Sequence, residues 1–226
     1  SRKIVMDIIQ DRTIDLRKRA VVALLFVDEI QEKIDESEIK EIKSVREKYL
    51  DKGFLEELIN ELEEYRDNEG SKYDDMHEYF KVFKDLKHIT PDDPLGLNDA
   101  LRYFWQTDED EELYIIKHRQ FEEYYKDKLY KFENILVYFV FRYFMKAVFD
   151  YDILAKIKTA LVSYMIIREL AVVRYIENNE FTDEDMVDIA HTYSKDIEHL
   201  EENIEALAEL FETNDVFDIE EMVIAL

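Results

Sequence analysis

The sequence predicts an all-α protein, an irregular multi-helix bundle of roughly ten helices with no sheet. Its 226 residues include only three glycines and two prolines, and apolar residues recur at the helical spacing along almost the whole chain. The composition is 47% hydrophobic and 13% aromatic. This is enough apolar material to bury a core of ordinary size without disulfides, and it argues against disorder.

The first part of the chain predicts a layer of helices. An amphipathic segment with Ile4, Val5, Ile8 and Ile9 comes first, and Asp15 is placed to cap a helix that runs to about Ile34. Later helices in this layer are expected, between breaks at Gly53 and at residues 68–71, over 37–51, 54–67 and 72–87.

The best break in the chain lies at 88–97, which holds both prolines and one glycine. We therefore expect an N-terminal helical layer over 1–87, a loop over 88–97, and an aromatic-rich helical bundle over 98–226. The loop is short and flanked by apolar residues, so the two parts are expected to pack as one unit.

The C-terminal bundle should contain four helices, a seam and a short last helix. The four helices are expected at about 98–106, 109–131, 132–149 and 151–178. Thr182 and Asp185 form an approximate capping box that starts the next helix. Apolar residues then step by three and four from Met186 to Phe211, which predicts one packing seam, and Asp218 starts the last helix.

The charge of the chain restricts its partners. The net charge is −25, and residues 177–226 carry 17 acidic residues and one lysine, which is −16 of that total. Nucleic-acid binders need basic patches, so we expect no nucleic-acid partner. No transmembrane segment or signal peptide is visible. The acidic C-terminal part favours either plain solubility or attraction of a lysine-bearing protein.

The chain has no cysteine, which excludes disulfides, thiolate metal sites and a cysteine nucleophile within it. This composition is typical of a cytoplasmic protein. The sequence opens with Ser1-Arg2-Lys3 in place of Met, so we expect it to be a piece of a longer protein.

Two aromatic helices, within residues 132–178, hold the best candidate site residues. A helical projection places Arg168 on the apolar face of the second helix, where a guanidinium needs an acidic or carbonyl partner. If the two helices pair as an antiparallel hairpin, Glu133 on the first helix is the nearest candidate partner in sequence. The pair is read either as a buried structural ion pair or as a substrate-facing one.

A polar line runs along the first aromatic helix, where Asn134, Tyr138, Arg142 and Lys146 are four residues apart. It is either a narrow wetted stripe on a mostly buried helix or a polar seam that lines a pocket.

Motifs for catalysis are mostly absent from the sequence. The three glycines are isolated, so no phosphate loop or glycine-rich nucleotide loop can form. Four histidines follow an aspartate by three residues: Asp74/His77, Asp85/His88, Asp188/His191 and Asp196/His199. Aspartate is short for bridging metals, so we expect no metal site and prefer surface pairing of each Asp with its His.

Four segments, in this order, resemble the helical region that follows the cysteine-rich part of flagellin lysine-N-methylase-like proteins. They are QDRTIDLRKRAVVALLFVDEIQEKID (10–35), FENILVYFVFRYFM (132–145), SYMIIRELAVV (163–173) and TYSKDIEHLEENIEAL (192–207). The residues that match the family pattern are Arg12, Arg19, Glu133, Asn134, Arg168, Glu198 and His199.

The resemblance implies the helical, substrate-docking part of a protein-lysine methylase, with flagellin or a similar lysine-bearing protein as partner. S-adenosylmethionine and a metal cluster are implied only for the full-length protein, because the chain departs from the family in having no cysteine. No catalytic residue can be assigned, and we expect no cofactor in the chain and no activity from it alone. The competing hypothesis is an all-α interaction or scaffold domain with no enzymatic role.

Overall fold

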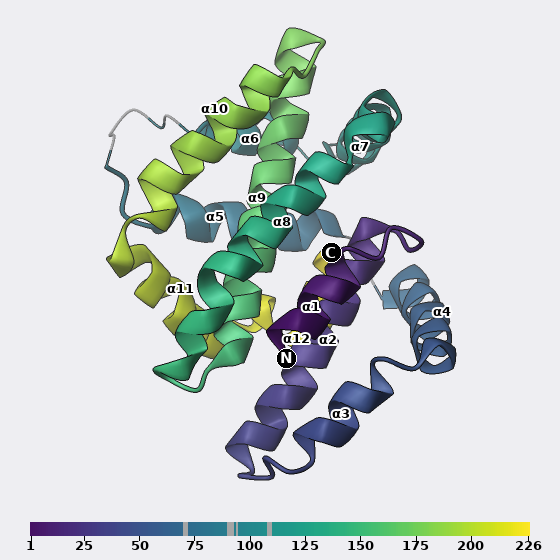
Figure 1. Cartoon of the computed structure of the whole chain (residues 1–226). Helices are drawn as coiled ribbons and strands as arrows, with labels where there is room; N and C mark the ends of the chain where they lie inside the picture. The colour runs from purple at the N-terminus through teal and green to yellow at the C-terminus, as the bar shows by residue number, and fades with distance from the viewer. Residues whose placement is uncertain (70–71, 90–92, 94, 108–109) are drawn as a thin grey trace.

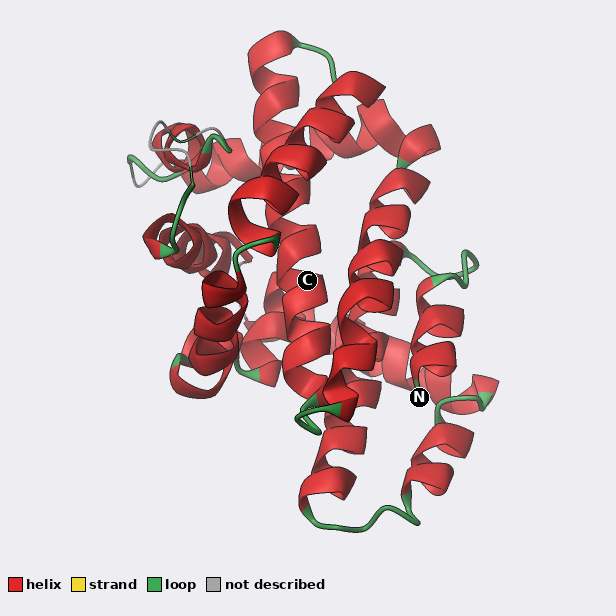
Figure 2. Ribbon diagram, turned by 60° about the vertical axis from the view of Figure 1, so that its left-hand side comes forward, coloured by secondary structure: helices red, strands yellow, loops and turns green. Residues whose placement is uncertain are grey.

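The computed structural model of the chain describes residues 1–69, 72–89, 93, 95–107 and 110–226, and its helices are arranged around one another as Figure 1 shows. Across these residues there are twelve α-helices and four short 3-10 or π turns, with no strand (Figure 2). The predicted all-α class is therefore confirmed. None of the described helices is both long and apolar enough to cross a bilayer.

The helices of the first part of the chain are α1 (Arg2–Ile9), α2 (Leu16–Asp35), α3 (Ile42–Lys48), α4 (Lys52–Glu69) and α5 (Lys72–Asp85). Those that follow are α6 (Leu97–Phe104), α7 (Asp110–Tyr125), α8 (Tyr130–Tyr143), α9 (Ile153–Asn178), α10 (Asp183–Tyr193), α11 (Glu201–Thr213) and α12 (Ile219–Ala225).

Helix α9 is the centre of the fold. Every residue from Ile157 to Val173 is buried, and the helix contacts α2, α5, α6, α7, α8, α10 and α11. Its start is fixed by Asp152, whose carboxylate accepts a hydrogen bond from the Ala155 N–H at 2.8 Å. The buried hydroxyls of Thr159 and Ser163 donate to the carbonyl four residues earlier, both at 2.7 Å, so they need no solvent.

Helices α8 and α9 lie side by side, as the hairpin hypothesis requires (Figure 1). Helix α8 also packs against α1, and α2 packs against α9. Helix α8 therefore has α1 on one side and α9 on another, so its side chains can contact residues of both helices.

Several predicted helix boundaries were wrong. The helix expected over 37–51 is only α3, because the backbone turns at Ser37, where φ is 61°. Gly53 does not separate two helices but lies in the first turn of α4, where the Asp51 carboxylate accepts from the Phe54 N–H at 2.8 Å. Helix α7 ends at Tyr125 and not at 131, since a 3-10 turn follows it.

The predicted seam from Met186 to Phe211 is broken in the structure. Helix α10 ends at Tyr193, a π turn covers Ser194–Glu198, and Leu200 is extended before α11 begins. Apolar residues spaced three and four positions apart are compatible with two short helices as well as with one long helix. The capping box at Thr182 and Asp185 is confirmed.

The connection between α5 and α6 coincides with the predicted 88–97 loop. Pro91 and Pro94 lie outside the described residues. Gly96 has a φ of 80° and precedes the first turn of α6, a backbone conformation that glycine adopts at no steric cost. At the other end of the chain, α12 packs against α2, α4 and α5, so the last helix reaches back to the N-terminal layer.

Candidate functional site: a groove beside a set of buried ion pairs

Arg168 is buried, as the helical projection predicted, with 6% of its surface exposed. The predicted partner was wrong. The Arg168 guanidinium donates to the carboxylate of Glu122 on α7, which also accepts from Arg17 on α2. Glu133 does not contact Arg168, because the side of α8 that carries Glu133 faces the N-terminal helices.

Glu133 is instead held by two arginines from the start of the chain. Arg12 donates to it from Nη2 at 2.8 Å and Arg19 from Nη1 at 2.7 Å. The Arg19 Nη1 also donates to the Ile9 carbonyl. Burial alone would raise the pKa of Glu133, but these two hydrogen-bonded cations outweigh it and lower the pKa. The cluster joins the α1–α2 connection to α8.

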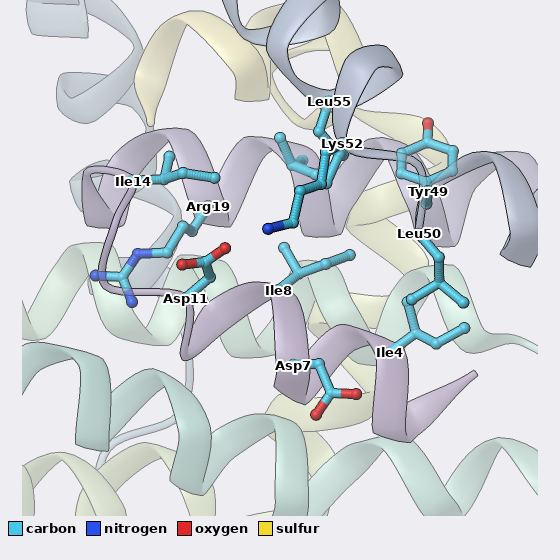
Figure 3. Close-up of a pocket in the computed structure, with 11 residues that line it drawn as sticks. Ile4, Asp7, Ile8, Asp11, Ile14, Arg19, Tyr49, Leu50, Lys52 and Leu55 are labelled. Atoms are coloured by element: carbon cyan, nitrogen blue, oxygen red, sulfur yellow. The ribbon is translucent and has the colours of Figure 1, made fainter.

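A pocket lies next to this cluster, between α1, α2 and the segment from Tyr49 to Leu55 (Figure 3). Ile4, Ile8 and Leu55 line it, and Figure 3 shows the Lys52 ammonium and Asp11 carboxylate pointing toward its middle. Its wall includes Arg19, whose charge is already satisfied by Glu133. Arg12, Arg19 and Glu133 are therefore best explained as a structural clamp.

A second network of buried charged residues was not predicted from the sequence. On α9, Glu169 accepts from Lys72 at 3.0 Å and bonds the Nε2 of His118 at 2.5 Å. Burial lowers the pKa of Lys72 to about 7 and lowers that of His118. Burial would raise the pKa of Glu169, but His118 and Lys72 hold it well below its usual value. The sequence feature that could have indicated this network is Glu169 itself, a charged residue within an apolar helix.

The predicted polar line is split in the structure, because α8 ends at Tyr143 and not at 149, and Lys146 lies in the 3-10 turn Phe144–Val148 that follows. Asn134 and Tyr138 line a groove, while Lys146 is exposed and lies over the Tyr143 ring at 5.3 Å from its centroid. The groove has a volume of about 470 Å³. Helix α8 forms one side of it, α10 the other, and Ile167 of α9 its floor. Its other lining residues are Ile135, Phe139, Val187, Ala190, His191, Ser194 and His199.

Glu198 lies on the π turn and is bonded to a residue that lines this groove. Its side chain is buried, and it accepts from the Tyr138 hydroxyl at 2.9 Å, the Arg142 Nε at 3.1 Å and the Ser194 hydroxyl at 2.6 Å. A π turn projects residues at a different angle from an α-helix. Here it turns Glu198 inward toward α8 and leaves His199 exposed at the groove. Three predicted site residues, Asn134, Tyr138 and His199, therefore line this groove. Two more, Glu198 and Arg142, are linked to it through the Tyr138 hydroxyl.

The expected surface pairing of histidines with the aspartate three residues before them was wrong for two of them. His88 bonds Asp196 at 2.5 Å and not Asp85. His77 stacks on the Trp105 ring with centroids 5.3 Å apart. In both cases a residue distant in sequence offers a more buried contact. Within the described residues, no group of three or more His, Asp and Glu side chains could hold a metal ion.

Comparison with known families decides the affiliation of the chain. The model of the FliB lysine N-methylase C-terminal domain matches residues 2–225. The chain belongs to this family. A search of curated proteins gave no match, and a search of solved structures gave none. The resemblance to this family is thus confirmed over nearly the whole chain.

The residues of this FliB C-terminal domain do not fit a cysteine-held metal cluster, because the sequence contains no cysteine. Its glycines, at 53, 70 and 96, are too far apart to form a glycine-rich loop around a nucleotide-like methyl donor. What the chain does offer is a surface groove and well-anchored aromatic side chains. These features suit recognition of another molecule.

Proposed function

We propose that the groove between α8 and α10 docks a lysine-bearing helix of the protein substrate of a FliB-type methylase, with flagellin as that substrate. The observation that carries this proposal is an open, mostly apolar groove of about 470 Å³ beside the most acidic part of the chain. In this account the domain holds the substrate, and methyl transfer is not assigned to it. The cysteine-free sequence supports a cytoplasmic setting.

The apolar surface around the groove supports docking of a helix. Val187 on α10 is 67% exposed and Tyr138 on α8 is 45% exposed, and both line the groove. Large exposed apolar side chains that gather at one place mark interaction surfaces more often than scattered ones do. An amphipathic helix can bury its apolar face in such a groove through residues one turn apart.

The charge distribution supports a lysine-bearing partner. Residues 177–226, which include α10 and α11, carry 17 acidic residues and one lysine. Glu184 and Asp188 are exposed on α10 beside Val187. Such a field attracts lysine side chains and accelerates encounter, and salt screens it over a Debye length of about 8–10 Å.

Glu198 supports the shape of the groove. Its carboxylate is fixed by three donors, and one of them, the Tyr138 hydroxyl, belongs to a ring that lines the groove. Loss of the carboxylate would free that ring and the Arg142 guanidinium together. We therefore assign Glu198 a positioning role and the apolar residues the direct contacts.

The test is the affinity of the chain for purified flagellin, measured by biolayer interferometry for the wild type and Val187→Arg. This change adds a cation and removes an apolar contact at the groove, and we expect affinity to fall at least about tenfold. Raising salt from about 0.05 to about 0.5 M should weaken wild-type binding, because the attraction is partly electrostatic.

Ile39→Arg is the matched control. Ile39 is 59% exposed in the turn between α2 and α3, so the same change in charge occurs away from the groove. We expect its affinity to stay within about twofold of wild type. Equal losses in both variants, or no flagellin binding by the folded wild-type chain, would contradict the proposal.

A further inference from the structure

A further cavity lies apart from both the groove and the pocket of Figure 3. It is formed where the first turn of α2 meets α7 and α9. Its volume is about 280 Å³. Its polar lining is made of Arg17, Arg168, Glu122, Tyr164 and Asp15, and its apolar lining of Leu16, Leu129 and Phe132. The Asp15 carboxylate accepts from the backbone N–H of Arg17 at 2.9 Å. Neither the family affiliation nor the docking of a substrate helix accounts for a cavity with this lining.

Two guanidinium groups share one carboxylate in this cavity. The side chains of Arg17 and Arg168 are 25% and 7% exposed, and both donate to Glu122, whose side chain is 37% exposed. In the described part of the chain, each guanidinium uses only Nη2 in a hydrogen bond, to Glu122. Repulsion from Arg168 lowers the pKa of Arg17. One carboxylate does not saturate two planar, five-donor cations.

Tyr164 adds a hydroxyl to the lining. The residue as a whole is 3% exposed, but its hydroxyl is not one of the fully buried side-chain atoms without a partner, which in the described part of the chain belong to Arg19, Tyr114 and Tyr125. Because Tyr164 lines the cavity together with both arginines, its hydroxyl is available to anything bound there.

The apolar lining restricts the kind of ligand. Leu129 is half-buried and Phe132 is almost fully buried, so part of the cavity cannot solvate a bare inorganic ion. A ligand that satisfies the whole cavity presents an oxyanion to the arginines and a flat apolar group to Phe132. Glu122 is more exposed than either arginine and can turn toward solvent when the oxyanion takes its place. Asp15 is exposed at the rim, where its carboxylate accepts from the Arg17 N–H.

We propose that this cavity binds a small organic oxyanion, a carboxylate or phosphate ester on a flat apolar group. Arg17 and Arg168 form salt bridges to the oxyanion, the Tyr164 hydroxyl donates to it, and Glu122 is displaced. Paired arginines are suited to carboxylates and phosphates because their planar fork matches two oxygens at once. This site does not depend on the proposed docking of flagellin.

The test is calorimetric titration of the whole chain with benzoate, with phenyl phosphate and with the neutral isostere benzamide. We expect saturable binding of at least one anion and none of benzamide. The preferred anion distinguishes a carboxylate ligand from a phosphate ester. Benzamide binding as tightly as the anions, or no binding of either anion, would overturn the proposal.

The decisive variant is Glu122→Gln, which removes the competing carboxylate. It should tighten anion binding about tenfold, whereas a purely structural Glu122 would leave the cavity no better at binding anions. Arg17→Gln and Tyr164→Phe should weaken binding; Arg17→Gln removes the guanidinium, and Tyr164→Phe keeps the ring and removes only the hydroxyl. Arg142→Gln, at the groove, is the control and should bind anions as wild type does.

A variant that unfolds is recognised by circular dichroism before titration. If Arg17→Gln does not fold, Tyr164→Phe and Glu122→Gln still test the site in opposite directions. Weaker or unchanged binding in folded Glu122→Gln would contradict the displacement of Glu122 and overturn the proposal.

Discussion

The clamp between Glu133 and two arginines gives the sharpest stability prediction. The Glu133 side chain is 2% exposed and that of Arg19 is 7% exposed, with Nη1 2.7 Å from Oε2. Glu133→Gln keeps the volume but leaves the Arg19 cation buried without a countercharge. Breaking a buried pair in this way costs about 3–5 kcal/mol. The Ile9 carbonyl still accepts from Arg19, so we expect the lower end of that range.

Urea unfolding followed by circular dichroism measures this loss. With a denaturant slope of about 2–3 kcal/mol/M, a loss of about 3 kcal/mol moves the midpoint down by about 1–1.5 M. Arg12→Gln serves as the control on the same carboxylate. The Arg12 side chain is 63% exposed, so its removal should shift the midpoint far less.

A double-mutant cycle separates the observed partner of Glu133 from the one that the sequence suggested. Glu133 and Arg19 should couple by about 0.5–3 kcal/mol, whereas Glu133 and Arg168 should be additive within about 0.5 kcal/mol, since they share no partner. A Glu133→Gln midpoint within about 0.3 M of wild type would refute the reasoning. Stronger coupling of Glu133 to Arg168 than to Arg19 would refute it too.

Three further predictions concern stability. Burial lowers the pKa of His118 in the folded chain, so as the pH falls the unfolded chain takes up a proton on this imidazole before the folded chain does. The free energy of unfolding should therefore fall as pH drops below about 6.5. It should fall less steeply in His118→Gln. Thr182→Ala should cost about 0.5–2 kcal/mol in urea unfolding through loss of the capping box. Ile166→Ala, at a fully buried position, should cost about 2–5 kcal/mol, whereas Phe149→Ala, at a position 86% exposed, should stay within about 0.5 kcal/mol.

The local features of this fold could be read from the sequence. Asp15 and Thr182 cap the helices that they were expected to cap, because capping depends on residues within one turn. The burial of Arg168 followed from the angular position of its neighbours on α9. Each of these inferences uses contacts between residues close together in the chain.

The partners of buried charges could not be read in the same way. Sequence proximity favoured Glu133 for Arg168, but the partner, Glu122, comes from α7, and Glu133 pairs with residues more than a hundred positions away. Helical periodicity gives the face of a side chain but not the helix that covers it. The network of Lys72, His118 and Glu169 draws on three helices, so no local pattern shows it.

The groove was foreseen in part. The spacing of Asn134, Tyr138 and Arg142 correctly suggested a polar line on α8, and the structure places two of them at the groove and the third on Glu198. The inward turn of Glu198 could not be foreseen, because it depends on a π turn that interrupts the predicted seam. A regular helix through this point would direct the side chain differently.

The most direct test of the docking account is hydrogen–deuterium exchange of the chain with and without flagellin. The account predicts slower exchange in the presence of flagellin within 134–142 and 187–199, the segments that hold most of the groove lining and the Arg142–Glu198 bond beside it. Exchange in α3 and α4, on the other side of α2, should stay unchanged. Protection confined to α3 and α4, or no protection at the groove while flagellin is bound, would contradict the account.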